Sequence, residues 1–355
     1  MLQTLCLALV MVGITAYAVL GSADFGAGFW DLTAGGAQRG GRIRGMVQRS
    51  MSPVWEANHV WLIFVLVIVW TAFPVAFGSI FSTLSIPLFL AAVGIIFRGA
   101  AFAFRGQAAT IREARALGAL FATSSVLIPF CFGAALGGVA SGRVRVGNAA
   151  GDPWSSWLNP TSILVGALAV ITGTHLAAVF LAGDSRRAGQ PDLVRAFRIR
   201  ALASGVVAGI VALGGVAVVR SDARSLYDGL VSGGGLVCVI ASGLCGVATL
   251  ALVWVERYGP ARLTAAAAVA AITVGWAFAQ HPYLLPPNLT LDQAAAANAT
   301  LAAVLVGIGI GAIVLAPSLW LLYRLVLRGT LDQEFEPLDQ RFRPRSASDE
   351  GRRPA

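Results

Sequence analysis

Three polar residues stand together at the start of an apolar stretch. Glu56, Asn58 and His59 lie in the sequence Pro-Val-Trp-Glu-Ala-Asn-His-Val-Trp-Leu, and apolar residues continue from there to Phe73. A stretch of this length can cross a bilayer. An ionisable side chain there usually faces protein or a file of water and often serves proton or ion traffic. The alternative is that Glu56 lies at the water-exposed end of its helix, and the sequence leaves both interpretations open.

A second carboxylate, Asp24, has a similar setting. It lies in the sequence Gly-Ser-Ala-Asp-Phe-Gly-Ala-Gly-Phe-Trp, where Gly26 and Gly28 allow another helix to approach closely. Two carboxylates on adjacent helices near one membrane face, Asp24 and Glu56, can form a proton entry. The alternative is that Asp24 only pairs with an arginine such as Arg98.

Two arginines on one helix are candidates for charge pairing. Arg98 and Arg105 are seven residues apart, so they share one face of the helix that they are predicted to form. Arg98 can extend to the membrane surface, or it can bind Glu56, Asp24 or a lipid phosphate. We favour a buried charge pair.

The remaining polar candidates are His175 and Trp61. His175 lies deep in an apolar segment and can ligate haem iron, relay a proton or form a hydrogen bond across helices. We favour the hydrogen bond, because no second haem ligand is evident. Trp61 is placed to line a helix contact or an apolar cavity.

Motifs for autonomous catalysis are absent from the sequence. It contains no CxxCH haem-attachment motif, no nucleotide-binding or metalloprotease motif and no nucleophile elbow. The four cysteines lack the spacing of a metal site. We therefore predict no catalytic residue, no metal and no bound cofactor in this chain.

The composition is that of an integral membrane protein. Of 355 residues, 57% are hydrophobic and 12% are charged, which is about half the charged fraction of a soluble domain. The net charge is +9, and all 26 basic residues are arginines. They lie in short loops between apolar segments and in the C-terminal tail, a pattern that orients membrane proteins rather than one that binds nucleic acid.

Nine apolar segments are long enough to span a membrane. They cover residues 2–29, 55–77, 80–104, 115–139, 160–182, 199–219, 233–255, 261–280 and 299–326. Only Gly78 and Ser79 separate the second segment from the third, which predicts a tight hairpin. The expected fold is an all-α bundle of about nine transmembrane helices over residues 1–328, followed by a polar, disordered cytoplasmic tail over residues 329–355.

The arginines predict the orientation of the bundle in the membrane. All fall on one predicted side except Arg143, Arg145, Arg220 and Arg224. The N-terminus is therefore expected outside and the C-terminus in the cytoplasm. This orientation places Glu56 at the cytoplasmic mouth of the second span, Asp24 in the cytoplasmic half of the first, and the loop that contains Asp292 outside.

Several motifs resemble subunit II of the cytochrome bd-type quinol oxidases. They are Ala-Asp-Phe-Gly-Ala-Gly from Ala23, Ser-Pro-Val-Trp-Glu-Ala-Asn-His-Val-Trp-Leu from Ser52, Phe97-Arg98 through Phe104-Arg105, Leu158-Asn159-Pro160, and Phe278 through Leu301 with Asp292. The second motif is specific, and the others are individually weak but occur in the same order. Together they cover nearly the whole membrane domain.

The resemblance implies a nine-helix subunit of the bacterial cell membrane that pairs with a haem-bearing subunit I. Such a complex oxidises quinol and reduces dioxygen to water with protons from the cytoplasm, and the haems and the quinol-oxidising loop belong to subunit I. Subunit II contributes stability, a proton route and, in some members, an oxygen route or a structural quinone. The resemblance makes Asp24, Glu56, Asn58 and His59 proton-route candidates, and it places Trp61 beside an oxygen path. A bound lipid is also expected.

Two positions depart from the family's pattern. Many members have a further aspartate near the position of Gly21, and an acidic residue at the position of Ala103 between the paired arginines. A proton route drawn through either position lacks its carboxylate here. Water held by Ser22 or Asn58, or carboxylates of the partner, would have to substitute. The alternative functions are a secondary transporter and a purely scaffolding membrane subunit.

Overall fold

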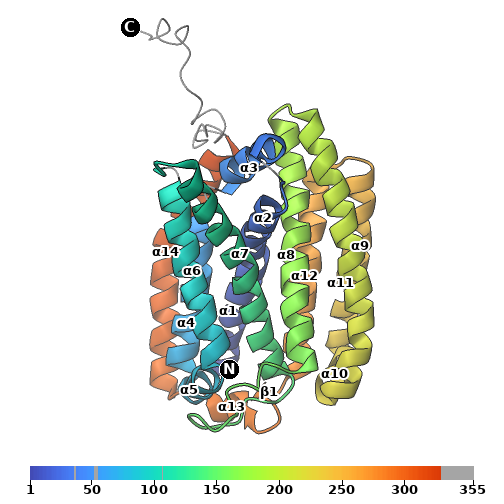
Figure 1. Cartoon of the computed structure of the whole chain (residues 1–355). Coiled ribbons are helices and arrows are strands. Elements are labelled where there is room, and N and C mark those ends of the chain that lie inside the picture. The colour runs from blue at the N-terminus through green and yellow to red at the C-terminus, as the bar shows by residue number, and fades with distance from the viewer. Residues whose placement is uncertain (36, 52–54, 106, 329–355) are drawn as a thin grey trace, which may run out of the picture.

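Long helices run side by side between the two ends of the molecule (Figure 1). The computed structural model describes residues 1–35, 37–51, 55–105 and 107–328. At a few helical positions beside the gaps and near the end of the last helix, only the backbone is described, and Glu56 is one of them. The predicted tail over residues 329–355 lies outside the described residues.

The first membrane segment consists of three consecutive helical pieces, and a small hairpin joins the last two long helices. The elements in chain order are α1 (Leu2–Ala16), the π-helical turn η1 (Tyr17–Gly21), α2 (Ser22–Leu32), α3 (Ala37–Met51), α4 (Trp55–Ala72), α5 (Pro74–Thr83), α6 (Ser85–Arg105), α7 (Ile111–Ala140), α8 (Pro160–Arg187), α9 (Pro191–Asp222), α10 (Arg224–Leu230), α11 (Gly233–Trp254), α12 (Tyr258–Gln280), β1 (Tyr283–Leu285), β2 (Leu289–Thr290), α13 (Leu291–Ala294) and α14 (Asn298–Leu327). Strands β1 and β2 pair antiparallel.

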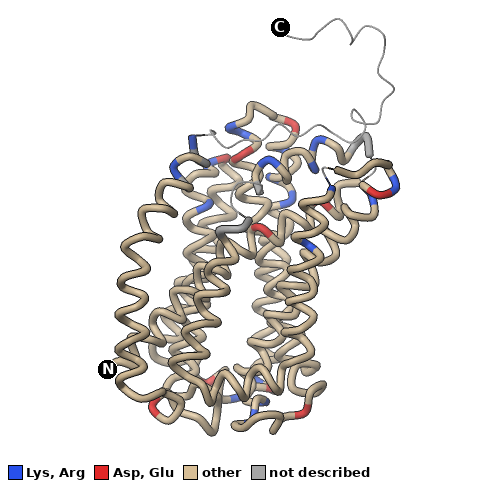
Figure 2. Tube along the Cα trace, turned by 90° about the vertical axis from the view of Figure 1, so that its left-hand side faces the viewer, with Lys and Arg blue, Asp and Glu red and all other residues tan. Residues whose placement is uncertain are grey.

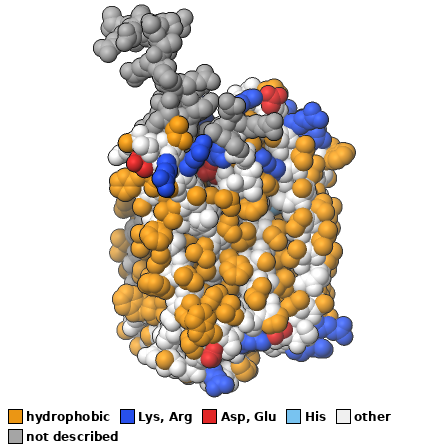
Figure 3. All heavy atoms as spheres, in the orientation of Figure 1, with side chains coloured by type: hydrophobic (Ala, Val, Ile, Leu, Met, Phe, Trp, Pro, Cys, Tyr) orange, Lys and Arg blue, Asp and Glu red, His pale blue; other side chains and the backbone are white. Residues whose placement is uncertain are grey.

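The surface matches a protein that crosses a membrane. Hydrophobic side chains cover the middle of the bundle (Figure 3), and charged residues gather at its two ends (Figure 2). In the described part of the chain, eight helices are long and apolar enough to cross a membrane, and α4 with α5 makes nine if this bent pair counts as one span. The predicted all-α membrane bundle is confirmed.

The two ends of the bundle differ in charge. The N-terminus lies at the end that carries α5, α10 and α13, and the far end of α14 lies at the end that carries α3 (Figure 1). Arginines gather mainly at the α3 end (Figure 2). Which end faces the cytoplasm stays a prediction from this asymmetry.

The predicted hairpin at Gly78 and Ser79 is wrong. Helix α5 continues through both residues, and the chain turns earlier, at Phe73, where φ is −136° and ψ is 59°. The axes of residues 58–72 and of α5 differ by 119°. Pro74 explains the turn, because a proline disfavours the helical conformation in the residue before it. Helix α5 therefore lies across the end of the bundle and links α4 to α6 (Figure 1).

Helix α2 lies close to its neighbours because of its glycines. It packs on α7 and α8. A Cβ atom added to Gly26 would lie 1.9 Å from the carbonyl oxygen of Gly173 on α8, and one added to Gly28 would lie 2.3 Å from the Cβ of Ser125 on α7. Small residues thus bring three helices together around the segment that carries Asp24.

Substitution of Gly26 tests this packing. We expect Gly26→Ala to lower the melting midpoint of the purified complex, because the added methyl group collides with backbone and overpacking of this kind costs about 1–3 kcal/mol. Gly209→Ala on α9 is the matched control, since nothing lies within 4 Å of its added Cβ. Equal melting midpoints for the two variants would contradict the close contact of α2 with α8.

Candidate functional site

A buried ion pair joins α2 to α6. The Nη1 atom of Arg98 lies 3.0 Å from Oδ2 of Asp24, and the two residues are 2% and 5% exposed. Arg98 also donates from Nη2 to the main-chain oxygen of Asp24 (3.2 Å) and from Nε to Oγ of Ser125 (2.9 Å). The guanidinium lies 5.0 Å from the ring centre of Phe25 and 4.8 Å from that of Phe121. Arg98 is therefore fixed on all sides.

The Asp24 carboxylate has an oppositely charged partner but accepts no directed hydrogen bond from the described residues. Neither Oδ1 nor Oδ2 accepts a well-directed hydrogen bond from any described residue. The Nη1 atom of Arg98 is close enough for Coulomb attraction, but its N–H groups are not aimed at the carboxylate. Both oxygens are thus buried with hydrogen-bonding capacity that no described residue fills.

A second ion pair lies one heptad further along the same helices. Nη1 of Arg105 donates to Oδ2 of Asp31 at 2.7 Å, and Nε of Arg44 on α3 lies 3.2 Å from Oδ1 of Asp31. Seven residues separate Asp24 from Asp31, and seven also separate Arg98 from Arg105. Seven residues are about two helical turns, so the two pairs lie on the same faces of α2 and α6, about two turns apart.

Asp31 was missed by the sequence analysis. It lies only one residue before the end of α2, where a carboxylate suggests a membrane surface. The matching spacing of two aspartates and two arginines was the signal that could have revealed it. Asp31 differs from Asp24 in having two arginines, which engage both of its oxygens.

Helix α4 carries two further buried polar groups, on Asn58 and Trp61. Asn58 is 3% exposed, and its Nδ2 atom donates to the main-chain oxygen of Leu20 in η1 (3.3 Å). Its Oδ1 atom and the Nε1 atom of Trp61 are buried and have no hydrogen-bond partner among the described residues. The ring of His59 packs edge-on against Tyr17 and Phe25, with centroid distances of 6.1 and 6.0 Å. The side chain of Glu56 lies outside the description.

His175 and Asp292 do not join this group. Nδ1 of His175 lies 3.0 Å from the carbonyl oxygen of Ala201 on α9, so the histidine makes a hydrogen bond between helices. Asp292 lies in the first turn of α13, at the opposite end of the bundle, and accepts a hydrogen bond from Nε2 of Gln3 (2.9 Å). In the described part of the chain, no three His, Cys, Asp or Glu side chains cluster as a metal site would require.

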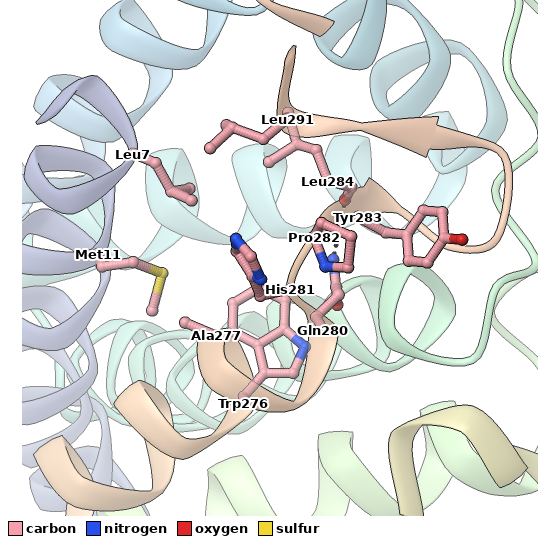
Figure 4. A pocket seen from close by; sticks show the side chains of 10 residues that line it. All are labelled: Leu7, Met11, Trp276, Ala277, Gln280, His281, Pro282, Tyr283, Leu284 and Leu291. Atoms are coloured by element: carbon pink, nitrogen blue, oxygen red, sulfur yellow. Dashed lines mark hydrogen bonds between the residues drawn. The ribbon is translucent and has the colours of Figure 1, made fainter. Parts of the chain in front are cut away.

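A small pocket lies at the end opposite α3, between α1, α12 and β1. Figure 4 shows Leu7 and Met11 facing Trp276 and His281 across it. It is lined by apolar side chains with Gln280 and His281, and none of the residues that line it is a carboxylate. The pocket is therefore separate from the Asp24 group.

Comparisons with known proteins decide the family. A family model for cytochrome bd terminal oxidase subunit II matches residues 2–326. The chain belongs to this family. Membership implies a partner, subunit I, which carries the haems, and makes the chain a multi-pass protein of the bacterial cell membrane within an oxidoreductase complex.

Named relatives from bacilli agree with this family. A putative cytochrome bd menaquinol oxidase subunit II of Bacillus subtilis is 25% identical in an alignment of 329 residues that covers 88% of this chain and 92% of the relative. A cytochrome bd ubiquinol oxidase subunit 2 of the same organism is 27% identical over 37% of this chain and 38% of its own length. The solved bd oxidase of Geobacillus thermodenitrificans contains a chain that matches with a TM-score of 0.71 and 25% identity, over 92% of this chain and 98% of that one.

The two arginines around Asp31 generate a prediction about stability. Asp31→Asn leaves Arg105 and Arg44 without their carboxylate, and removal of one partner from a buried pair costs about 3–5 kcal/mol. We expect a much lower melting midpoint for the subunit II variant in the purified complex. Asp192→Asn is the control, because Asp192 pairs with Arg42 where both side chains are mostly exposed and such pairs contribute about 0–1 kcal/mol. A midpoint as high as that of the control would show that Asp31 does not hold the helices together.

Proposed function

We propose that this chain is the haem-free subunit of a quinol oxidase, and that it delivers cytoplasmic protons through Asp24 toward the haems of subunit I. Family membership over residues 2–326 supports the oxidase complex. In that complex the partner carries out quinol oxidation and the reduction of dioxygen to water. The proposed contribution of this chain is to hold a proton-accepting carboxylate inside the membrane.

The carboxylate of Asp24 is the observation that carries the proton role. It is 5% exposed, yet both of its oxygens lack a well-directed donor among the described residues. A carboxylate of this kind can take a proton from a bound water without first breaking a protein hydrogen bond. Arg98 lies 3.0 Å from this carboxylate and supplies the opposite charge that a buried ionisable group in a membrane requires.

The second carboxylate of α2 is suited to a different task. Both oxygens of Asp31 are engaged by arginines, and a proton on either would replace a charge-assisted contact. We therefore assign Asp31 a structural role and Asp24 the transfer role. Glu56 is the proposed entry, since the arginine asymmetry predicts that the start of α4 faces the cytoplasm. Asn58 and His59, which follow Glu56 on α4, are proposed to line the route between the two carboxylates.

Asp24→Asn and Glu56→Ala test the proton role in the purified complex. We expect both variants to slow quinol-driven oxygen uptake by about tenfold or more, since a positioned proton-transfer group contributes roughly 10²–10⁴ to a rate. Uptake is measured per haem, so that partial assembly does not imitate the effect. Asp228→Asn is the control, because Asp228 forms an exposed pair with Arg224 at the opposite end.

The outcomes separate a proton route from a scaffold. Slow uptake with an unchanged haem spectrum supports proton delivery. Unchanged uptake per haem, with a loss only of assembled complex, would show that Asp24 and Glu56 serve assembly alone. The second result is the expectation for a purely scaffolding subunit.

A further inference from the structure

A tyrosine hydroxyl is buried beside the Asp24 group without a protein partner. Tyr17 begins the π-helical turn η1, and its Oη atom has no hydrogen-bond partner among the described residues. Its ring packs edge-on against Phe25, His59 and Phe132 at centroid distances of 6.0–6.2 Å. Phe25 follows Asp24 directly in α2, and its ring also lies 5.0 Å from the guanidinium of Arg98. Contacts of the ring therefore fix the position of Tyr17, while its hydroxyl is free to bond to a water molecule.

Tyr17 occupies space that a side chain at position 21 would need. A Cβ atom added to Gly21 would lie 2.9 and 3.0 Å from two ring carbons of Tyr17. Any residue larger than glycine at position 21 would push the ring away. The absence of a side chain at position 21 thus gives the ring of Tyr17 its place against η1.

The unpaired polar atoms in this region complement one another. The Asn58 and Asp24 oxygens only accept, the Trp61 indole N–H only donates, and the Tyr17 hydroxyl does both. Helix α4 contacts η1 here, with the amide of Asn58 bound to Leu20. A buried polar atom left without a partner costs about 1–3 kcal/mol. Buried water commonly supplies the missing bonds in such places.

We propose that the hydroxyl of Tyr17 orders a water molecule that passes a proton to Asp24. The hydroxyl donates a hydrogen bond to this water, and the water in turn donates to an Asp24 oxygen. The water passes one proton to Asp24 and takes one proton from the next water of the route, so it ends as neutral water and the O–H bond of Tyr17 stays intact. Tyr17 is a positioning residue in this proposal, which rests on the proton route of the proposed function.

The test compares Tyr17→Phe with the unmodified complex. This substitution removes only the hydroxyl and keeps the ring contacts and the fit over Gly21. We expect oxygen uptake per haem to fall roughly fivefold, the factor that corresponds to one ordinary hydrogen bond in a barrier. We also expect a larger solvent deuterium isotope effect on uptake, because proton delivery then limits turnover. The isotope effect does not depend on how much complex assembles, so the test remains valid for a less stable variant.

Tyr258→Phe is the matched control. Tyr258 is also buried (3% exposed), and its hydroxyl likewise lacks a partner among the described residues, but it begins α12 and its ring packs against Arg186 rather than against the Asp24 group. We expect wild-type uptake and isotope effect for this variant. Wild-type values for Tyr17→Phe alongside slow Asp24→Asn would overturn the role of Tyr17 alone. Wild-type values for both would overturn the proton route itself.

Discussion

Burial of charge in a membrane is the constraint on which this structure depends. Asp24 and Asp31 place two negative charges on one helix where lipid offers no solvation, and the cost is acceptable only if each is paired. Arg98 and Arg105 reach across from α6 to pair with them. Glycines of α2 allow α7 and α8 to close around the same segment. The packing of α2, α6, α7 and α8 thus reflects the need to pair these charges and to shield them from lipid.

The two ion pairs differ in the hydrogen bonds around them, and the roles proposed for the two aspartates rest on this difference. The Asp31 pair is closed, because Arg105 and Arg44 engage both carboxylate oxygens. The Asp24 pair is open, because Arg98 directs two of its donors to a main-chain oxygen and to Ser125 instead. We propose that an ionised group with a charge partner but no directed hydrogen bond can exchange a proton without dismantling the contacts around it. The partner subunit supplies the haems, and this chain is proposed to supply the controlled access of protons.

The membrane spans followed from the sequence because length and apolar content alone determine them. The turn at Phe73 did not, since the glycine and serine at positions 78 and 79 looked like the stronger break and the effect of Pro74 on its neighbour was overlooked. Asp24 was recognised as a single carboxylate. Asp31 was overlooked because the spacing of Asp24 and Asp31 was not compared with the equal spacing of Arg98 and Arg105. Nothing in the sequence pointed to Tyr17. An aromatic residue in an apolar segment does not reveal whether it is buried or whether its hydroxyl has a hydrogen-bond partner.

The most direct measurement is the infrared difference spectrum of the complex between its reduced and oxidised forms, recorded for the unmodified chain, Asp24→Asn and Asp31→Asn. A carboxyl group that gains and loses a proton gives a carbonyl stretching band that an ionised carboxylate lacks. We expect this band in the unmodified complex and in any assembled Asp31→Asn complex, and its loss in Asp24→Asn. An identical spectrum for Asp24→Asn and the unmodified complex would contradict the proton-carrying role of Asp24.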